Sequence, residues 1–283
     1  PAEIARAFLT TEAAVLKRLV RAKEQIRDAR LPFEIPEGPD LAARLDGVLR
    51  SLYLLFSEGH APSRGENPVR AEICEEALRL AALLAAHPAG NRPPTHALLA
   101  LLLFGAARLP ARVDDGGNLL LIQEQDRARW DGGRIAAGLR HLALSAAGGE
   151  ITAYHCQAGI AATHMTAPDY AATDWAHIVA LYDQLARIAP SPVVALNRAV
   201  AVANLRGPVA GLGAVAAIPP AARAKLARYP HFHAVLGELA SRCHDPGGAA
   251  LHFTRALGLA GTRADRTLLE KKLAALSFTP TLH

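Results

Sequence analysis

The densest group of residues that could take part in chemistry surrounds a tryptophan between positions 124 and 131. A carboxylate beside an arginine can act as a general acid or base, and polar groups that converge next to an aromatic ring are typical of small-ligand pockets. The group consists of Glu124, Asp126, Arg127, Arg129, Trp130 and Asp131. A ligand pocket built on it would use Glu58, Asp126, Arg127 and Trp130.

The spacing within this group favours a structural role. Asp126 and Arg129 are three residues apart, and Arg127 and Asp131 are four residues apart. Side chains at these separations pair along a helix or turn. We therefore expect ion pairs that fasten the junction between residues 41–150 and residues 151–283, with a ligand pocket as the second interpretation and no catalytic residue.

No metal site and no cofactor is expected. His231, His233 and His252 could approach one another across a helical hairpin, but no acid or thiolate is spaced to complete a tetrahedral site. The three cysteines are widely separated and contain no CxxC pair, so the sequence indicates neither a disulfide framework nor a zinc knuckle.

A second chemistry, contact with nucleic acid, is indicated near the amino terminus. Residues 2–29 read as a short helix, a turn at 9–11 and a second helix that Thr11 caps. In a helix-turn-helix, residues at the start of the second helix reach base edges, and cations further along contact phosphates. We assign the first role to Thr11, Glu12 and Val15, and the second to Lys17, Arg18, Arg21 and Lys23. A solvated basic face is the simpler interpretation of this pattern.

The opposite face of the same segment is apolar. Val15, Leu19, Ala22 and Ile26 recur at spacings of four, three and four residues, which places them on one helical stripe. A two-helix piece buries little surface alone, so we expect this stripe to pack against the rest of the chain.

Composition predicts helices for the remainder of the 283 residues. Hydrophobic residues make up 51% and aromatic residues 5%, with abundant Ala and Leu, which are strong helix formers. The longest apolar run, residues 97–107, is well short of the roughly 20 residues that cross a bilayer. We therefore expect no membrane segment and a cytoplasmic location. The net charge of +5 is modest, but residues 1–30 hold seven Lys or Arg against four acids, which suits an anionic partner.

Proline and glycine divide the chain into segments. Three prolines between residues 31 and 39 make 31–40 a linker that follows a helix-turn-helix at 1–30. The first helix after it is marked by Leu41, Leu45, Val48, Leu52 and Leu55, with Tyr53 and Phe56 widening its apolar face. Later helices of about 12 residues are expected at 135–146, 152–164, 175–188, 193–205, 209–218, 221–229, 232–242, 247–259 and 263–276. The fold class is all-α, with a helical subdomain at 41–150 and helical hairpins at 151–283.

The last hairpins follow a tetratricopeptide pattern in part. Five of its eight signature positions are matched, by Leu236, Gly237, Ala249, Phe253 and Ala256. In this pattern, small residues let paired helices approach closely and large residues fill the space between pairs. The array therefore resembles tetratricopeptide repeats in degenerate form.

The amino-terminal run EIARAF, followed by AAVLKRLVRAKEQIR, resembles the end of region 4 of the extracytoplasmic-function (ECF) sigma factors. The family form is EIA, a turn, then TV, two polar or basic residues, RL and RA. It is matched by Ile4, Ala5, Val15, Arg18, Leu19, Arg21 and Ala22, whereas Ala14 and Leu16 differ from it.

The rest of the chain is similar to one subgroup of these sigma factors, which carries a long tetratricopeptide-like extension behind region 4. The similar segments are LYLLFSEGH, EQDRARWD, TDWAHIVALYDQL and SPVVALNRAVAVANLRGPVAGL. Departures from the usual form of the subgroup are Ser57, His60, Glu124 and Ala128.

The resemblance implies the C-terminal part of a sigma subunit that binds RNA polymerase core and promoter DNA, with an extension that modulates transcription initiation. It also implies further residues before Pro1. The alternative is that the helical array is the main actor, as a peptide-binding or ligand-sensing scaffold with a protein partner in its groove.

Overall fold

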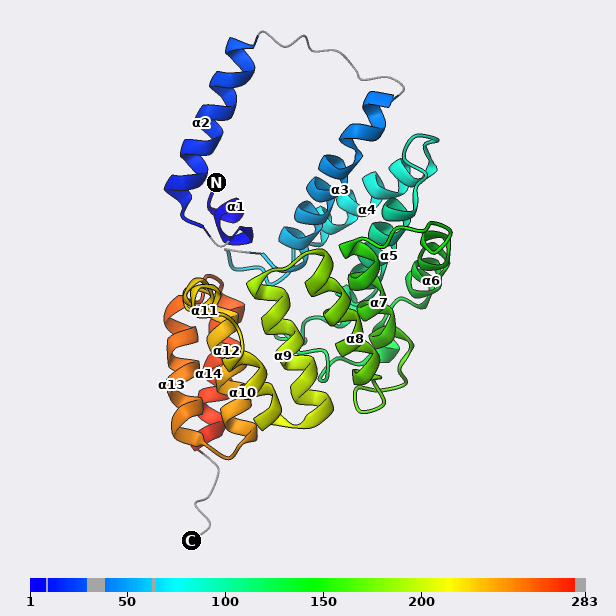
Figure 1. Cartoon of the computed structure of the whole chain (residues 1–283). Helices are drawn as coiled ribbons and strands as arrows, with labels where there is room; N and C mark the ends of the chain where they lie inside the picture. Colours follow the sequence, from blue (N-terminus) through cyan, green and yellow to red (C-terminus); the bar gives the residue numbers. More distant parts are fainter. Residues whose placement is uncertain (9, 30–38, 63–64, 278–283) are drawn as a thin grey trace.

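A computed structural model describes residues 1–8, 10–29, 39–62 and 65–277, and the fold is all-α as predicted (Figure 1). The described residues form two 3-10 helices, η1 (Leu109–Ala111) and η2 (Arg127–Arg129), and fourteen α-helices. The α-helices are α1 (Ala2–Ala7), α2 (Glu12–Asp28), α3 (Pro39–His60), α4 (Ala71–Ala86), α5 (Pro93–Ala107), α6 (Gly132–Ser145), α7 (Ala153–Thr166), α8 (Trp175–Ile188), α9 (Pro192–Arg206), α10 (Pro208–Ala216), α11 (Pro220–Leu226), α12 (Pro230–Arg242), α13 (Pro246–Leu259) and α14 (Arg263–Ser277). Most of the predicted linker, residues 30–38, lies outside the described residues.

Prolines and short polar side chains begin many of these helices. Pro192, Pro208 and Pro246 occupy first turns, where the N–H that proline lacks would have no helical partner. Before α8 and α9, Asp174 and Ser191 accept hydrogen bonds from backbone N–H groups inside the helix. The helix predicted at 175–188 is confirmed with the same bounds, and the other predicted helices after residue 132 are each present within a few residues.

The first core lies between α3, α4 and α5, and it corrects part of the predicted apolar face of α3. The buried residues of α3 are Leu49, Leu52 and Phe56. Val48 and Leu55, which the apolar spacing placed on the buried face, are 43% and 37% exposed. They lie one position before Leu49 and Phe56, and therefore about 100° around the helix from the buried face.

Helix α5 is the central element of the amino-terminal half. It packs against α3, α4, α6 and α7, and Phe104 on it is fully buried. A Cβ at Gly138 of α6 would lie 2.5 Å from a ring atom of Phe104, so only glycine allows α5 and α6 to approach this closely. In the described part of the chain, the one stretch with the length and apolarity of a membrane span, residues 93–111, is 67% buried inside this array. The burial marks it as a core helix.

Helices α12 and α13 pack as the tetratricopeptide pattern predicts. Ala249, Phe253 and Ala256 of α13 are at most 2% exposed. A Cβ at Gly237 of α12 would lie 2.6 Å from Cδ1 of Phe253. The absence of a side chain at residue 237 therefore makes room for the ring between the two helices.

The array is closed by contacts between parts that are distant in sequence. Figure 1 shows helices α3–α6 on one side, α7–α9 across the middle and α10–α14 on the other side. Gly65, before α4, forms an isolated parallel β-bridge with Thr262, before α14. Lys271 of α14 lies 3.8 Å from a carboxylate oxygen of Asp114. The carboxyl-terminal hairpin thus returns to the amino-terminal half.

Candidate functional sites

The predicted helix-turn-helix segment forms two helices that meet at a small contact. Thr11 is the N-cap of α2, and its hydroxyl accepts a hydrogen bond of 3.2 Å from the N–H of Ala14. Glu12 lies exposed in the first turn, and Leu9 of the predicted turn is outside the described residues. Val15 of α2 and Ala5 of α1 are only 4% and 5% exposed. Val15 is therefore a packing residue, and its predicted role in touching bases is wrong.

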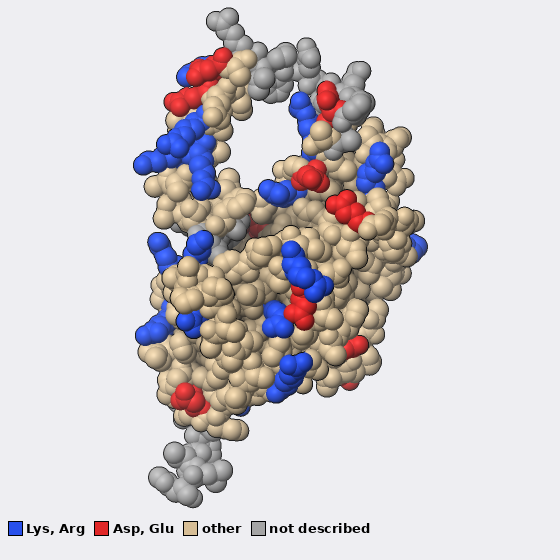
Figure 2. Space-filling model, in the orientation of Figure 1, with Lys and Arg blue, Asp and Glu red and all other residues tan. Residues whose placement is uncertain are grey.

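The four predicted phosphate-binding cations form an open basic surface on α2. This surface, which we call the α2 basic face, consists of Lys17, Arg18, Arg21 and Lys23, all of them exposed. Among the described residues, the ion pair that α2 contributes joins Arg27 to Asp28, so the four cations lack a carboxylate partner there. Figure 2 shows Lys and Arg side chains along the side of α2 that faces away from α3.

The apolar stripe of α2 does not pack against the array as expected. Leu19 and Ile26 are 38% and 54% exposed, and Ala22 is exposed as well. Figure 1 shows why, because α2 extends away from α3 and meets the rest of the fold near α1. Val15 is the buried member of the stripe because it lies in the turn of α2 nearest to α1.

The charged group around Trp130 joins two parts of the fold. Trp130 is 7% exposed, and the Arg127 guanidinium lies 4.4 Å from its ring centroid. One terminal nitrogen of Arg127 donates 2.8 Å hydrogen bonds to the carbonyl oxygens of His164 and Ala167 at the end of α7. These carbonyls have no partner within the helix, and a cation satisfies both their hydrogen bonding and the helix dipole. Arg127 thus connects the segments before and after residue 150, the fastening role expected of this group.

The ion pairs predicted within this group are wrong. Asp126 caps η2 by accepting a hydrogen bond from the N–H of Ala128, and Asp131 pairs with Arg134 of α6 at 3.2 Å. Arg134 also reaches Glu75 of α4 at 2.7 Å. The helix periodicity on which the predicted pairs depended is absent, because η2 is a single short turn followed by the extended residue Trp130.

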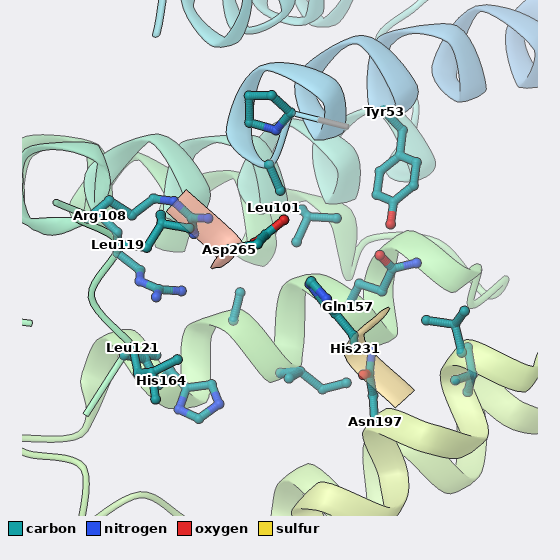
Figure 3. A pocket seen from close by; sticks show the side chains of 18 of the residues that line it. Tyr53, Leu101, Arg108, Leu119, Leu121, Gln157, His164, Asn197, His231 and Asp265 are labelled. Atoms are coloured by element: carbon teal, nitrogen blue, oxygen red, sulfur yellow. The ribbon is translucent and has the colours of Figure 1, made fainter. Parts of the chain in front are cut away.

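A large cavity lies at the junction of the two halves of the array, and the predicted pocket residues do not line it. It has a volume of about 990 Å³ and is bordered by α3, α5, α7, α8, α9, α12 and α14 (Figure 3). Its lining includes Arg108 and Arg112, which follow the apolar part of α5, and His164 of α7. A smaller cavity of about 330 Å³ shares Arg108 and His164 with it and also contains His60. Neither cavity is lined by the predicted pocket residues, Glu58, Asp126, Arg127 and Trp130.

Positive charge and burial dominate the chemistry of this junction. Burial, and then the nearby Arg112 and Arg127, lower the pKa of Arg108 to about 10. Burial also lowers the pKa of Arg112 to about 10, so both guanidiniums remain charged at neutral pH. Burial, and then Arg108 and Arg127, lower the pKa of His164 to about 4. Burial, and then the positive charges of Arg112 and Arg108, hold the pKa of His60 well below its ordinary value. Both imidazoles are therefore neutral at neutral pH.

Four histidines form two stacked pairs among the described residues. His96 and His141 stack with their Nδ1 atoms 3.0 Å apart, and His233 stacks on His252 with ring centroids 5.8 Å apart. Across the described ranges, no three or more His, Cys, Asp or Glu residues gather closely enough to hold a metal ion.

Two arginines in the sequence indicate the cavity, although they were not among the predicted site residues. Arg108 and Arg112 come directly after the most apolar run of the chain, and they are four residues apart. Cations this close to a buried helix either pair with acids or line a polar cavity. His60 belongs to the segment LYLLFSEGH, where it departs from the usual subgroup form.

Part of this junction is similar to a family of known sequences. Residues 44–146 match a family of unknown function, DUF6596, and the matched segment includes Arg108, Arg112 and the Trp130 group. The chain is 38% identical over 279 residues to an uncharacterized protein of Rhizobium meliloti (strain 1021). The alignment covers 98% of the chain and 64% of that relative, so the chain spans less than two thirds of the relative's length. No solved structure matches the chain.

Proposed function

We propose that this chain is the C-terminal part of a cytoplasmic RNA polymerase sigma subunit, in which α2 contacts promoter DNA and the helical array regulates initiation. The observation that carries the proposal is the α2 basic face, a capped helix whose four exposed cations have no carboxylate partner in the described residues. Exposed cations without carboxylate partners suit the phosphate backbone, which dominates the affinity of proteins for DNA.

The arrangement of α2 also supports this proposal. Figure 1 shows α2 extending from the array, and Figure 2 shows open space between it and α3. Thr11 and Glu12 lie at the exposed start of the helix, where the residues of a second helix meet base edges. Binding to RNA polymerase core belongs to the same proposal and follows from the resemblance to region 4. The role proposed for the chain is therefore non-enzymatic.

The test is the salt dependence of binding to duplex DNA. Fluorescence anisotropy of a labelled promoter fragment gives the binding constant of the chain between 50 and 200 mM salt. Each phosphate contact contributes about 0.9 to the slope of log K against log salt concentration. The variant with Arg18→Ala and Arg21→Ala should bind more weakly, with a slope reduced by about 2.

A matched control separates a local contact from general charge. Arg255 is exposed on α13, so Arg255→Ala removes one positive charge away from α2. We expect it to leave both affinity and slope close to those of the unaltered chain. Equal slopes for the α2 double variant and the unaltered chain would rule out the basic face as the DNA contact, and the scaffold alternative would then take its place.

A further inference from the structure

The cavity between the two halves of the array contains more positive charge than its surroundings balance. Arg108 and Arg112 line it, and Arg127 is close enough to both Arg108 and His164 to lower their pKa. Asp265 of α14 supplies the single carboxylate among the described lining residues. None of the ion pairs in the described part of the chain includes Arg108, Arg112 or Arg127. Asp265 is close enough to Arg112 to offset part of the effect of burial on its pKa, but one carboxylate does not balance the two guanidiniums that line the cavity, so a demand for negative charge remains.

The hydrogen-bonding groups of these arginines are only partly used. Arg108 donates through Nε to Gln125 at 3.1 Å, and its terminal nitrogens have no partner among the described residues. Arg112 contacts His60 through one terminal nitrogen at 3.1 Å, and its buried Nε has no partner. The buried Nδ1 of His164 has no partner either. The carboxyl-terminal end of α5 places a partial negative charge of about half an elementary charge near Arg108, which does not balance two guanidiniums.

The remaining wall of the cavity is mostly apolar, with a few polar groups at a distance from the arginines. Figure 3 shows Arg108 and His164 on one side of the space and Tyr53, Gln157 and Asn197 on the other. The volume, about 990 Å³, lies at the upper end of the range for small-molecule sites. Planar guanidiniums bind carboxylate and phosphate groups through paired hydrogen bonds.

We infer that this cavity binds a small organic anion, whose carboxylate or phosphate group lies against Arg108 and Arg112 and whose apolar body occupies the space between α7, α8 and α9. The site is separate from the proposed DNA contact, because α2 contributes no residue to its lining. The ligand would contact both halves of the array at once.

Two probes with the same tail and different charged groups test this inference, namely octanoate and octyl phosphate, with octanol as the uncharged control. Tryptophan fluorescence can report binding, because both tryptophans of the chain lie beside cavity residues. Trp130 is 5.9 Å from the Arg108 guanidinium, and Trp175 packs edge-on against His164 at 5.3 Å. We expect a saturable change with at least one of the two anions and a much weaker change with octanol. The tighter anion identifies the charged group that the site prefers.

Variants of the full chain then locate the site. Arg112→Gln should weaken binding of the preferred anion about 10- to 100-fold, since hydrogen bonds to charged groups contribute about 1.5–3 kcal/mol. Arg129→Gln alters an exposed arginine outside the cavity and should bind like the unaltered chain. If circular dichroism shows that Arg112→Gln is unfolded, Arg112→Lys keeps the charge without the paired donors and should still bind at least several-fold more weakly.

Three results would overturn the inference. They are the absence of binding by both anions, binding of octanol as tight as that of the anions, and unchanged affinity in a folded Arg112 variant. None of them bears on the DNA contact, which depends on α2 and is measured separately.

Discussion

Gly237→Ala is the substitution whose effect can be worked out most directly from the packing. A Cβ at residue 237 would lie 2.6 Å and 2.7 Å from two ring carbons of Phe253. Carbon atoms pack favourably at about 3.5–4.0 Å, so the ring or the helix must retreat by roughly 1 Å. Phe253 is 2% exposed and packs among Ala249, Ala256 and their neighbours. The ring is therefore enclosed by other core side chains, which must shift if it moves.

Two opposing effects determine the size of the change. Overpacking of a core of this kind costs about 1–3 kcal/mol, whereas replacing glycine by alanine inside a helix gains up to about 1 kcal/mol. Because two ring atoms and not a flexible chain end obstruct the new methyl group, we expect overpacking to prevail. The net loss in the free energy of unfolding should be about 1 kcal/mol. For a chain of this size that corresponds to a fall in Tm of roughly 2–4 °C.

Gly258→Ala is the matched control in the same hairpin. Gly258 is exposed on α13, and a Cβ there would meet nothing within 4 Å. Only the propensity effect operates, so this variant should gain up to about 1 kcal/mol. The two Gly→Ala changes thus have opposite signs, which thermal and urea unfolding followed at 222 nm can measure.

A double variant checks the cause. Adding Phe253→Leu to Gly237→Ala removes the ring that obstructs the methyl group, so the two changes together should cost less than the sum of their separate effects. If Gly237→Ala is as stable as the unaltered chain, or if the two losses simply add, the close approach of α12 and α13 at this glycine is not what fixes their packing.

Three further predictions concern the junction and its surroundings. Arg127→Ala removes two hydrogen bonds to the end of α7, so it should lower the free energy of unfolding in urea by about 2 kcal/mol. The control Arg129→Ala alters an exposed side chain and should cost less than about 0.5 kcal/mol. Similar losses for both variants would show that Arg127 does not fasten the junction. Burial lowers the pKa of His164 to about 4 in the folded chain, whereas an unfolded histidine has a pKa near 6.5. The stability that depends on neutral His164 is therefore complete above pH 6.5 and is lost as pH falls toward 4. The loss is roughly 3 kcal/mol at most. His164→Phe should therefore flatten the decline of the urea midpoint between pH 6.5 and 4.5, and an unchanged decline would refute this. Burial raises the pKa of Cys74 to about 11 and also raises that of Cys156, whereas Cys243 is partly exposed. Iodoacetamide should therefore label Cys243 first in the native protein, which mass spectrometry can measure. Early labelling of Cys74 would contradict the packing of α3 on α4.

Local signals in the sequence account for most of the helices. Thr11 caps α2 as expected, and the helix at 175–188 begins after Asp174 because its carboxylate accepts a backbone hydrogen bond there. Gly237 and Phe253 likewise match a pattern whose meaning is packing. Each of these features depends on residues close together in the chain or on a known spacing, which is why they were predictable.

The cavity and the faces of some helices depend on tertiary structure instead. In α3, Val48 and Leu55 are as apolar as Leu49, and only the positions of α4 and α5 decide which of them is buried. The cavity brings Arg108 together with His164 and Asp265, which are 56 and 157 residues further along the chain. No spacing rule connects such positions. The group around Trp130 stands out in the sequence because its residues are adjacent, although the larger site lies beside it.

The bridge between Gly65 and Thr262, with the pairing of Asp114 and Lys271, distinguishes this array from an open solenoid. In an open solenoid each unit contacts only its neighbours, so the ends can fray and unfolding can spread inward from either one. Here the last hairpin is joined to the first half, and fraying from the carboxyl-terminal side must break contacts with distant helices as well. The hairpins between them are consequently expected to exchange their amide protons together, as one cooperative unit rather than as a gradient along the chain.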